Sequence, residues 1–234
     1  MMKSNDYKRN PYNVLFIYNI KDMIKCLKSL IIDSKKFLNE KKNKPLVIVG
    51  PSAVGKDTMI NRFIMKYPDV IKKLPSYTTR PKREGEIEGK DYYFVTKEKF
   101  LKMKNEGLLF GIQEYNNNFY ASSKKKLKEA VEKNDKIIIL NYNIETAYAV
   151  KDEIDFNFVA LLPPNEDELR KRLIKRKTKA EEIEKRMANS IKEICLINEA
   201  NFINYRLVND DEERTFNKLE KYLKEIYPQF FNKK

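Results

Sequence analysis

The segment VIVGPSAVGKDTM, residues 47–59, joins a short apolar run to a loop that contains two glycines. Gly50 and Gly55 are separated by four residues and Lys56 follows, which is the spacing of a phosphate-binding loop between a strand and a helix. The backbone N–H groups of such a loop and the N-terminus of the next helix attract a phosphate. Asp57 stands where a hydroxyl residue usually follows the lysine, and Thr58 comes next. We therefore expect phosphate groups on this loop, with Thr58 supplying the hydroxyl for phosphate or Mg²⁺.

The chain around this loop alternates strand patterns with helix patterns. Apolar runs at 136–140 and 156–162, like the PLVIV run before the loop, are typical of strands that are buried on both faces. Strands that alternate with helices predict an α/β fold with a parallel sheet. A more aromatic segment at 76–122 breaks the pattern, and we interpret it as an inserted lobe on the substrate side. The spacing of apolar residues predicts helices at 58–67, 123–133, 144–151, 165–176, 180–199 and 212–226.

The composition excludes several kinds of chemistry. The 234 residues include no histidine, which excludes histidine-based acid–base catalysis and histidine metal sites. The two cysteines, Cys26 and Cys195, form neither a disulfide framework nor a metal-binding spacing, so a reducing compartment is expected. The net charge of +14 favours polyanionic partners, but lysine recurs along the whole chain. We interpret this charge as a compositional bias and expect no nucleic-acid binding.

Residues 1–44 are interpreted as an N-terminal extension, 45–228 as the domain and 229–234 as a tail. Apolar spacing between Ile20 and Leu38 predicts an amphipathic helix, which would pack against the domain or a second copy. Organelle targeting is the alternative, and the acidic residues of this segment argue against it. No apolar run is long enough to span a membrane. We expect a cytoplasmic protein that is a monomer or a homodimer and does not bind membranes.

The segment PSYTTRPKREGEIEGKDYYFV, residues 75–95, is the second informative stretch. Arg80 and Arg83 are three residues apart, with Ser76 before them and Tyr92 after them. Two guanidinium groups and a phenol form a suitable site for a terminal phosphate. A solvated basic hairpin would show the same pattern, so these residues alone leave both interpretations open.

These two segments, followed by NNNFYAS, LLPPNEDELRKRL and LVNDD in this order, resemble the guanylate kinase family over about residues 45–228. The string TTR-x-x-R-x-GE-x-x-G-x-DY-x-F is the most specific part. The resemblance implies a P-loop nucleoside monophosphate kinase fold that transfers the γ-phosphate of ATP to GMP, with Mg²⁺. It implies a parallel-sheet core at 45–75 and 123–228, a GMP-binding lobe at 76–122 and a lid at about 170–187.

The resemblance also implies roles for individual residues. Ser76 and Ser122 would lie near the base. For the arginines between 170 and 186, the alternative interpretation is a basic helix face exposed to solvent. The GMP site would comprise Ser76, Arg80, Arg83, Tyr92, Tyr120, Ser122 and Asn143. The ATP site would comprise Asn209 and the loop residues Gly50, Pro51, Ser52, Ala53, Val54, Gly55, Lys56, Asp57 and Thr58, with Thr58 also near the metal. The catalytic groups would be Lys56, Arg172, Arg176 and Arg186.

Several positions depart from the family pattern. Gly111 replaces the glutamate that reads guanine, and Glu114 lies three residues away. Asn141 and Asn143 replace the two acids of an Asp-x-Asp sequence. An amide keeps the size of a carboxylate and loses its charge. We therefore expect GMP to be the best acceptor, with weak discrimination against IMP, and expect Gly111→Glu with Asn143→Asp to raise the preference for GMP. Two further family glycines are replaced by Ala121 and Thr146.

Two alternative functions stay open. A related small-molecule phosphotransferase with a different acceptor would share this core, and such kinases of ribose phosphate compounds can carry an aspartate after the loop lysine. A catalytically weakened guanylate-kinase-like binding module typically loses the ATP loop, whereas this chain keeps Lys56 and both glycines. The intact acceptor string favours a nucleoside monophosphate. An assay of ADP release with each monophosphate distinguishes the three functions.

Overall fold

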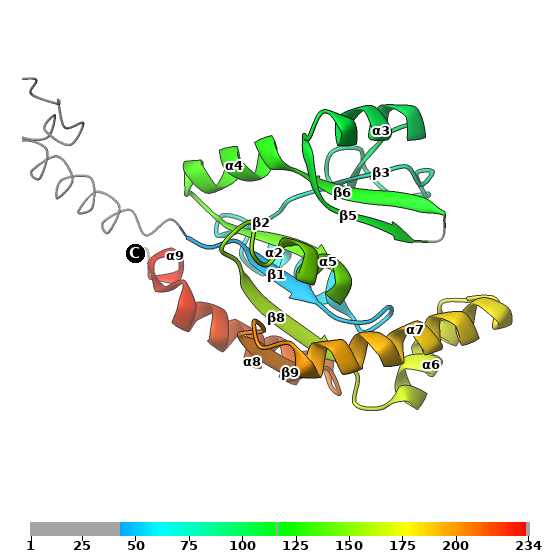
Figure 1. Ribbon diagram of the computed structural model, residues 1–234. Coiled ribbons are helices and arrows are strands. Elements are labelled where there is room, and N and C mark those ends of the chain that lie inside the picture. Colours follow the sequence, from blue (N-terminus) through cyan, green and yellow to red (C-terminus); the bar gives the residue numbers. More distant parts are fainter. Residues whose placement is uncertain (1–42, 116, 233–234) are drawn as a thin grey trace, which may run out of the picture. The chain divides into compact units, whose positions relative to one another are not determined.

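The computed structural model describes residues 43–115 and 117–232 (Figure 1). The chain divides after Lys41 into two units, and all the described residues lie in the second, Lys42–Lys234. The amphipathic helix predicted between Ile20 and Leu38 lies outside the described residues. All helices and strands within the described residues belong to the second unit.

A five-stranded parallel sheet forms the core, in the order β2-β7-β1-β8-β9. The central strand β1 pairs with β7 through Leu46 and Ile139, and with β8 through Leu46 and Asn157. All four residues of β1 are fully buried, as its continuous apolar run predicts for a strand that is covered on both faces. The predicted α/β fold with a parallel sheet is confirmed. The strands are β1 (Leu46–Val49), β2 (Ile71–Lys73), β7 (Ile137–Tyr142), β8 (Asn157–Leu162) and β9 (Tyr205–Val208).

Helices cover both faces of this sheet (Figure 1). Leu46 and Ile48 pack on one face with α2 (Lys56–Lys66), α6 (Glu166–Lys175), α7 (Ala180–Glu199), α8 (Glu212–Ile226) and α9 (Pro228–Phe231). Val47 and Val49 pack on the other face with α4 (Lys124–Lys133), α5 (Ile144–Val150) and the last turns of α7. This alternation follows from the two-residue period of a strand. No helix within the described ranges is both long and apolar enough to cross a membrane.

Residues 76–123 build a second, mixed sheet in the order β4-β3-β6-β5. It has its own small core of Phe100, Leu109 and Ala121, and the rings of Phe100 and Phe119 stack at 5.5 Å. The elements are β3 (Ser76–Thr78), β4 (Tyr92–Phe94), α3 (Lys97–Asn105), β5 (Leu109–Tyr115) and β6 (Asn118–Ser123). This sheet explains the aromatic character of the segment, because a small lobe needs large rings to fill its core.

Side-chain caps set the beginnings of several helices. Ser123, Asn143, Asn165 and Asp211 each accept a hydrogen bond from the backbone N–H three residues later. Helix α2 begins at Lys56, two residues before the predicted start. The sequence patterns did not indicate β2 and β9, because lysine or arginine interrupts their short apolar runs.

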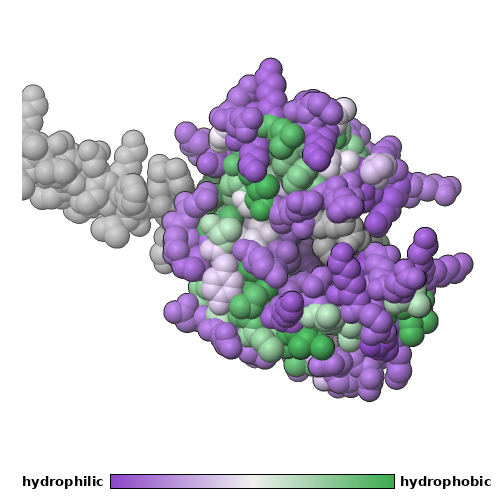
Figure 2. Space-filling model, turned by 45° about the vertical axis from the view of Figure 1, so that its right-hand side comes forward, coloured by the Kyte–Doolittle hydropathy of each residue, from purple (hydrophilic) through white to green (hydrophobic). Residues whose placement is uncertain are grey.

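Hydrophilic side chains cover most of the face shown in Figure 2 and surround a hollow near its centre. This distribution agrees with a chain in which 35% of the residues are charged.

Candidate active site

The phosphate loop depends on close backbone approaches at its two glycines. A Cβ on Gly50 would overlap the carbonyl oxygen of Leu161 on β8, and a Cβ on Gly55 would lie 2.5 Å from Nδ2 of Asn209. Ala53 also has a positive φ of 63°, although it carries a side chain. This left-handed conformation costs about 1–2 kcal/mol for a residue with a Cβ. The tight packing around the glycines therefore holds the loop in an otherwise unfavourable shape.

Lys56 is folded back over the loop. Its Nζ donates hydrogen bonds to the carbonyl oxygens of Gly50 (2.6 Å) and Pro51 (3.0 Å). Burial lowers the pKa of Lys56, and the charges of Glu193 and Asp57 oppose this effect. The ammonium must leave these carbonyl oxygens, or share its three donors, to reach a bound phosphate.

Arg172 and Asn209 also hydrogen-bond to the loop backbone. The guanidinium of Arg172 donates to the carbonyl oxygens of Val54 (3.1 Å) and Asn209 (2.9 Å). Nδ2 of Asn209 also donates to Val54 O (2.7 Å), and the Asn209 side chain is buried. In this structure Arg172 therefore contacts the loop backbone. It fixes the shape of the site that the donor phosphates would occupy.

The other two predicted arginines lie near the same loop. Arg186, on α7, pairs with Glu182 one turn earlier, and its Nη1 lies 3.5 Å from the Ser52 hydroxyl. Arg176 follows α6 and is exposed, and its charge is close enough to lower the pKa of Lys56. The fold thus gathers three basic side chains around residues 50–58 from two helices that are distant from the loop in sequence.

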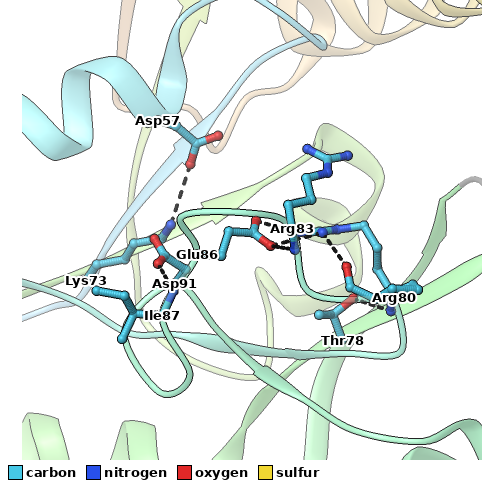
Figure 3. Close-up of polar contacts among 9 residues, drawn as sticks. Asp57, Lys73, Thr78, Arg80, Arg83, Glu86, Ile87 and Asp91 are labelled. Atoms are coloured by element: carbon cyan, nitrogen blue, oxygen red, sulfur yellow. Dashed lines mark hydrogen bonds and ion pairs between the residues drawn. The ribbon is translucent and has the colours of Figure 1, made fainter.

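The residues predicted to bind the acceptor phosphate lie on β4, β6 and the loop after β3. Arg80 makes a two-pronged ion pair with Glu86, with distances of 2.6 and 3.1 Å, and Glu86 also accepts the Arg83 N–H at 2.8 Å (Figure 3). The Cζ of Arg80 lies 5.4 Å from the ring centroid of Tyr92, whose ring is 6.0 Å from that of Tyr120. Glu86 thereby fixes the direction of the Arg80 guanidinium.

Tyr92 keeps its phenolic proton over the ordinary pH range. Burial raises its pKa to about 12, and the nearby negative charge of Asp57 adds to the shift. A protonated phenol can donate to a phosphate oxygen without adding negative charge. Together with the guanidinium of Arg80, it offers donors suited to a terminal phosphate.

An unpredicted contact joins the phosphate loop to this acceptor cluster. Asp57 accepts a hydrogen bond from Nδ2 of Asn141 at 2.9 Å. It also forms an ion pair with Lys73 at 3.5 Å (Figure 3). The Lys73 Nζ in turn lies 5.5 Å from the ring centroid of Tyr92. No local pattern in the sequence indicates Lys73, because it is one of two lysines in a three-residue strand.

A cluster of hydroxyl groups includes Ser76 and Ser122, the two serines that the resemblance places near the base. The Tyr142 hydroxyl donates to the Ser122 hydroxyl at 2.7 Å, and the Ser76 and Ser122 hydroxyls are 3.4 Å apart. Tyr142 and Ser122 are both buried. Burial raises the pKa of Tyr142, so its phenol is neutral. The sequence analysis did not select Tyr142, although an aromatic residue inside an apolar strand is a recognisable signal.

The two positions that depart most from the family have structural partners. Gly111 has a φ of 58°, and a Cβ there would lie 3.1 Å from Cγ2 of Thr146 and 3.3 Å from the Tyr142 hydroxyl. Asn143 caps α5 by accepting the Thr146 N–H at 2.9 Å. Tyr142 and Thr146 therefore fill the space beside this glycine. The expectation that Gly111→Glu with Asn143→Asp raises the preference for GMP stays a prediction. Gln113 accepts a hydrogen bond from the Thr146 hydroxyl at 3.0 Å, which adds a neutral amide to this region.

Glu193 is a second residue that the sequence analysis did not select. It lies on α7, and in the described part of the chain its Oε2 is buried and has no hydrogen-bond partner. Burial raises the pKa of Glu193 to about 7; the charge of Lys56 lowers it and that of Glu145 raises it. A carboxyl group that titrates near neutral pH therefore lies close to the lysine of the phosphate loop.

A cavity of about 970 Å³ opens beside β2 and α4, with Lys72, Lys133 and Lys136 in its lining. It includes none of residues 50–58, and Arg80 lies outside its lining. Lys73 is in the lining, so the cavity borders the acceptor cluster at this lysine. Because the phosphate loop and Arg80 lie outside the lining, we do not place the nucleotides in this cavity.

Comparisons with known proteins identify the family of this chain. The guanylate kinase family model matches residues 42–226. Guanylate kinase 1 of Oryza sativa subsp. japonica is 33% identical over 87% of this chain, which spans only 54% of that protein. The guanylate kinase of Nitratidesulfovibrio vulgaris is 35% identical over 74% of this chain and 83% of that protein. The crystal structure of guanylate kinase from Anaplasma phagocytophilum superposes with a TM-score of 0.62 at 28% identity, covering 78% of this chain and 85% of that chain. The resemblance is confirmed, and the chain belongs to the guanylate kinase family of nucleoside monophosphate kinases.

Proposed function

We propose that this chain transfers the γ-phosphoryl group of ATP to GMP. The observation that carries the proposal is the Asp57–Lys73 contact of 3.5 Å, which spans from the phosphate loop to the Tyr92 side of the acceptor cluster. A donor phosphate on the loop and an acceptor phosphate beside Arg80 and Tyr92 would therefore be neighbours, in the space between the loop and the acceptor cluster. Phosphoryl transfer needs mainly positioning and charge neutralisation, which these groups can supply.

On the donor side, the loop N–H groups and Lys56 would hold the ATP phosphates. Arg172 and Asn209 would keep the loop open for them through their bonds to Val54 O. Arg176 and Arg186 would add positive charge on the side of α6 and α7, near the phosphoryl group in transfer. Preorganised charge of this kind stabilises a transition state at little reorganisation cost.

The residues of this site are compatible with a Mg²⁺ ion that takes most of its ligands from the nucleotide. Thr58 is exposed in the first turn of α2, directly after Asp57, so its hydroxyl is available to a ligand at the loop. Within the described residues no three acidic, histidine or cysteine side chains gather as a metal cage. Mg²⁺ commonly takes few protein ligands and keeps phosphate oxygens and waters. When bound, Mg²⁺ would neutralise phosphate charge, and Thr58 would be its protein ligand.

On the acceptor side, Arg80, Arg83, Tyr92 and Tyr120 would bind the GMP phosphate, and Ser76, Ser122 and Asn143 would approach the base. The hydroxyl and amide groups around Gly111 are neutral, so they would hold guanine less selectively than carboxylates. This neutral region favours a second candidate, a phosphotransferase of the same family that accepts another monophosphate. The predicted cytoplasmic location and the monomeric or dimeric state stay predictions.

The test is a coupled assay of ADP release with ATP, Mg²⁺ and each of GMP, IMP, AMP, CMP and UMP in turn. The proposed function requires the largest kcat/KM with GMP. A larger kcat/KM with another monophosphate would support the second candidate. Absence of ADP release with every acceptor, together with intact ATP binding, would support a binding module.

A further inference from the structure

Lys73 is a largely buried lysine between two parts of the site. It is the last residue of β2, and its side chain is 16% exposed. Its Nζ lies 3.5 Å from Asp57 on α2 and 5.5 Å from the ring centroid of Tyr92 on β4. A lysine is rarely buried to this extent without a charged partner or a function. The side chain therefore joins the first turn after the phosphate loop to a tyrosine of the acceptor cluster.

Tyr92 has a second cation close to it. The Cζ of Arg80 lies 5.4 Å from the same ring, so Arg80 and Lys73 are both neighbours of one phenol. Part of the Arg80 fork is already engaged by the two oxygens of Glu86. A nucleoside monophosphate brings a phosphate with close to two negative charges to this cluster. A cation beyond the Arg80–Glu86 pair would help to neutralise that charge.

The ion pair between Lys73 and Asp57 is too exposed on the Asp57 side to serve mainly for stability. Asp57 is 61% exposed, and exposed ion pairs contribute little to stability. Asp57 also accepts the Asn141 hydrogen bond, so it would keep a partner without Lys73. An ammonium on a flexible stem can turn from a carboxylate to a phosphate, because it is a point charge with three donors.

We propose that Lys73 is an additional cation of the acceptor-phosphate site, with Asp57 holding its ammonium beside Tyr92 before the monophosphate binds. The ligand is the phosphate group of a nucleoside monophosphate. The inference rests on the proposed function, which places the acceptor phosphate at Arg80 and Tyr92. Lys73 is a binding residue here and takes no part in bond making.

The experiment is isothermal titration of the purified chain with GMP, IMP, AMP and guanosine at one ionic strength. Lys73→Met should weaken binding of the preferred monophosphate about 10- to 100-fold, the size expected for a hydrogen bond between charged groups. Guanosine, which lacks the phosphate, should bind as it does to the wild type. Lys73→Arg should retain most of the affinity, and Lys72→Met, an exposed neighbour on the same strand, is the matched control.

A double variant separates phosphate binding from simple neutralisation of Asp57. If Lys73 binds the phosphate, Asp57→Asn with Lys73→Met stays as weak as Lys73→Met alone. Recovery of wild-type affinity in this double variant would overturn the inference, and so would unchanged affinity in Lys73→Met. If Lys73→Met does not fold, as judged by its circular dichroism melt, Lys73→Gln replaces it.

The outcomes distinguish this inference from the proposed function. A wild type that prefers IMP or AMP contradicts the proposed function, and Lys73 is then tested with that nucleotide. A wild type that binds none of the three monophosphates contradicts both. An equal loss of guanosine and monophosphate affinity in Lys73→Met would show a structural effect and overturn the inference.

Discussion

Replacing Glu193 with glutamine should flatten the dependence of stability on pH between about 5 and 8. In the folded chain, burial raises the pKa of Glu193 to about 7 from its ordinary value of 4.5. The folded state therefore keeps a proton that the unfolded state loses between these two pKa values. Because the folded state binds more protons in this window, the free energy of unfolding falls as the pH rises from about 4.5 to 7. Glutamine does not titrate, so the variant lacks this fall.

The size of the effect is set by the pKa shift. Each pKa unit corresponds to about 1.4 kcal/mol, so a shift from 4.5 to about 7 gives roughly 3 kcal/mol across the window. The opposing attraction of Lys56 is already contained in that shift. At pH 5 the variant and the wild type should have similar stability. At pH 8 Glu193→Gln should be the more stable protein by about 3 kcal/mol.

Urea unfolding of both proteins at pH 5, 6, 7 and 8 measures this difference. The control is Glu199→Gln, which removes an exposed carboxylate from the last turn of the same helix and should leave the pH dependence as in the wild type. Parallel stability curves for Glu193→Gln and the wild type would refute the reasoning. They would mean that the carboxyl group is solvated in solution and that its burial does not control its protonation.

Three further predictions concern turnover and base choice. Lys56→Ala should abolish ADP release and keep the circular dichroism melt of the wild type. The control Lys218→Ala, on the exposed face of α8, should change neither property. Full turnover by Lys56→Ala would contradict the catalytic assignment of Lys56. Gly111→Glu should lower the free energy of unfolding in urea by about 2 kcal/mol, because φ is 58° and Thr146 lies 3.1 Å from the added Cβ, and an unaffected variant would show that Thr146 moves aside. The ratio of kcat/KM for GMP and IMP should stay well below about 10⁴, the level of a fully hydrogen-bonded pocket, and a ratio at that level would reveal another base-reading group.

The fold class was predictable because its signals are local. The four-residue run of β1, the glycines at 50 and 55, and the helical spacing of 180–199 and 212–226 each lie within a short stretch. Their alternation predicts a parallel sheet with crossover helices. The strand order β2-β7-β1-β8-β9 was not predictable in this way, because pairing joins residues such as Leu46 and Ile139 that are far apart in the chain. The second sheet at 76–123 likewise depends on pairings that no local period encodes.

The sequence by itself determined the phosphate loop, because Gly50, Gly55 and Lys56 act as one contiguous segment whose spacing carries the chemistry. Only the tertiary structure decided which distant side chains surround it. Lys73, Tyr142 and Glu193 come from three separate elements and are brought to the site by packing. The raised pKa values of Glu193 and Tyr142 also arise from that packing, because a carboxyl or phenol group has an ordinary pKa until folding removes water from around it. Lys73 likewise gains Asp57 as a partner only through the fold.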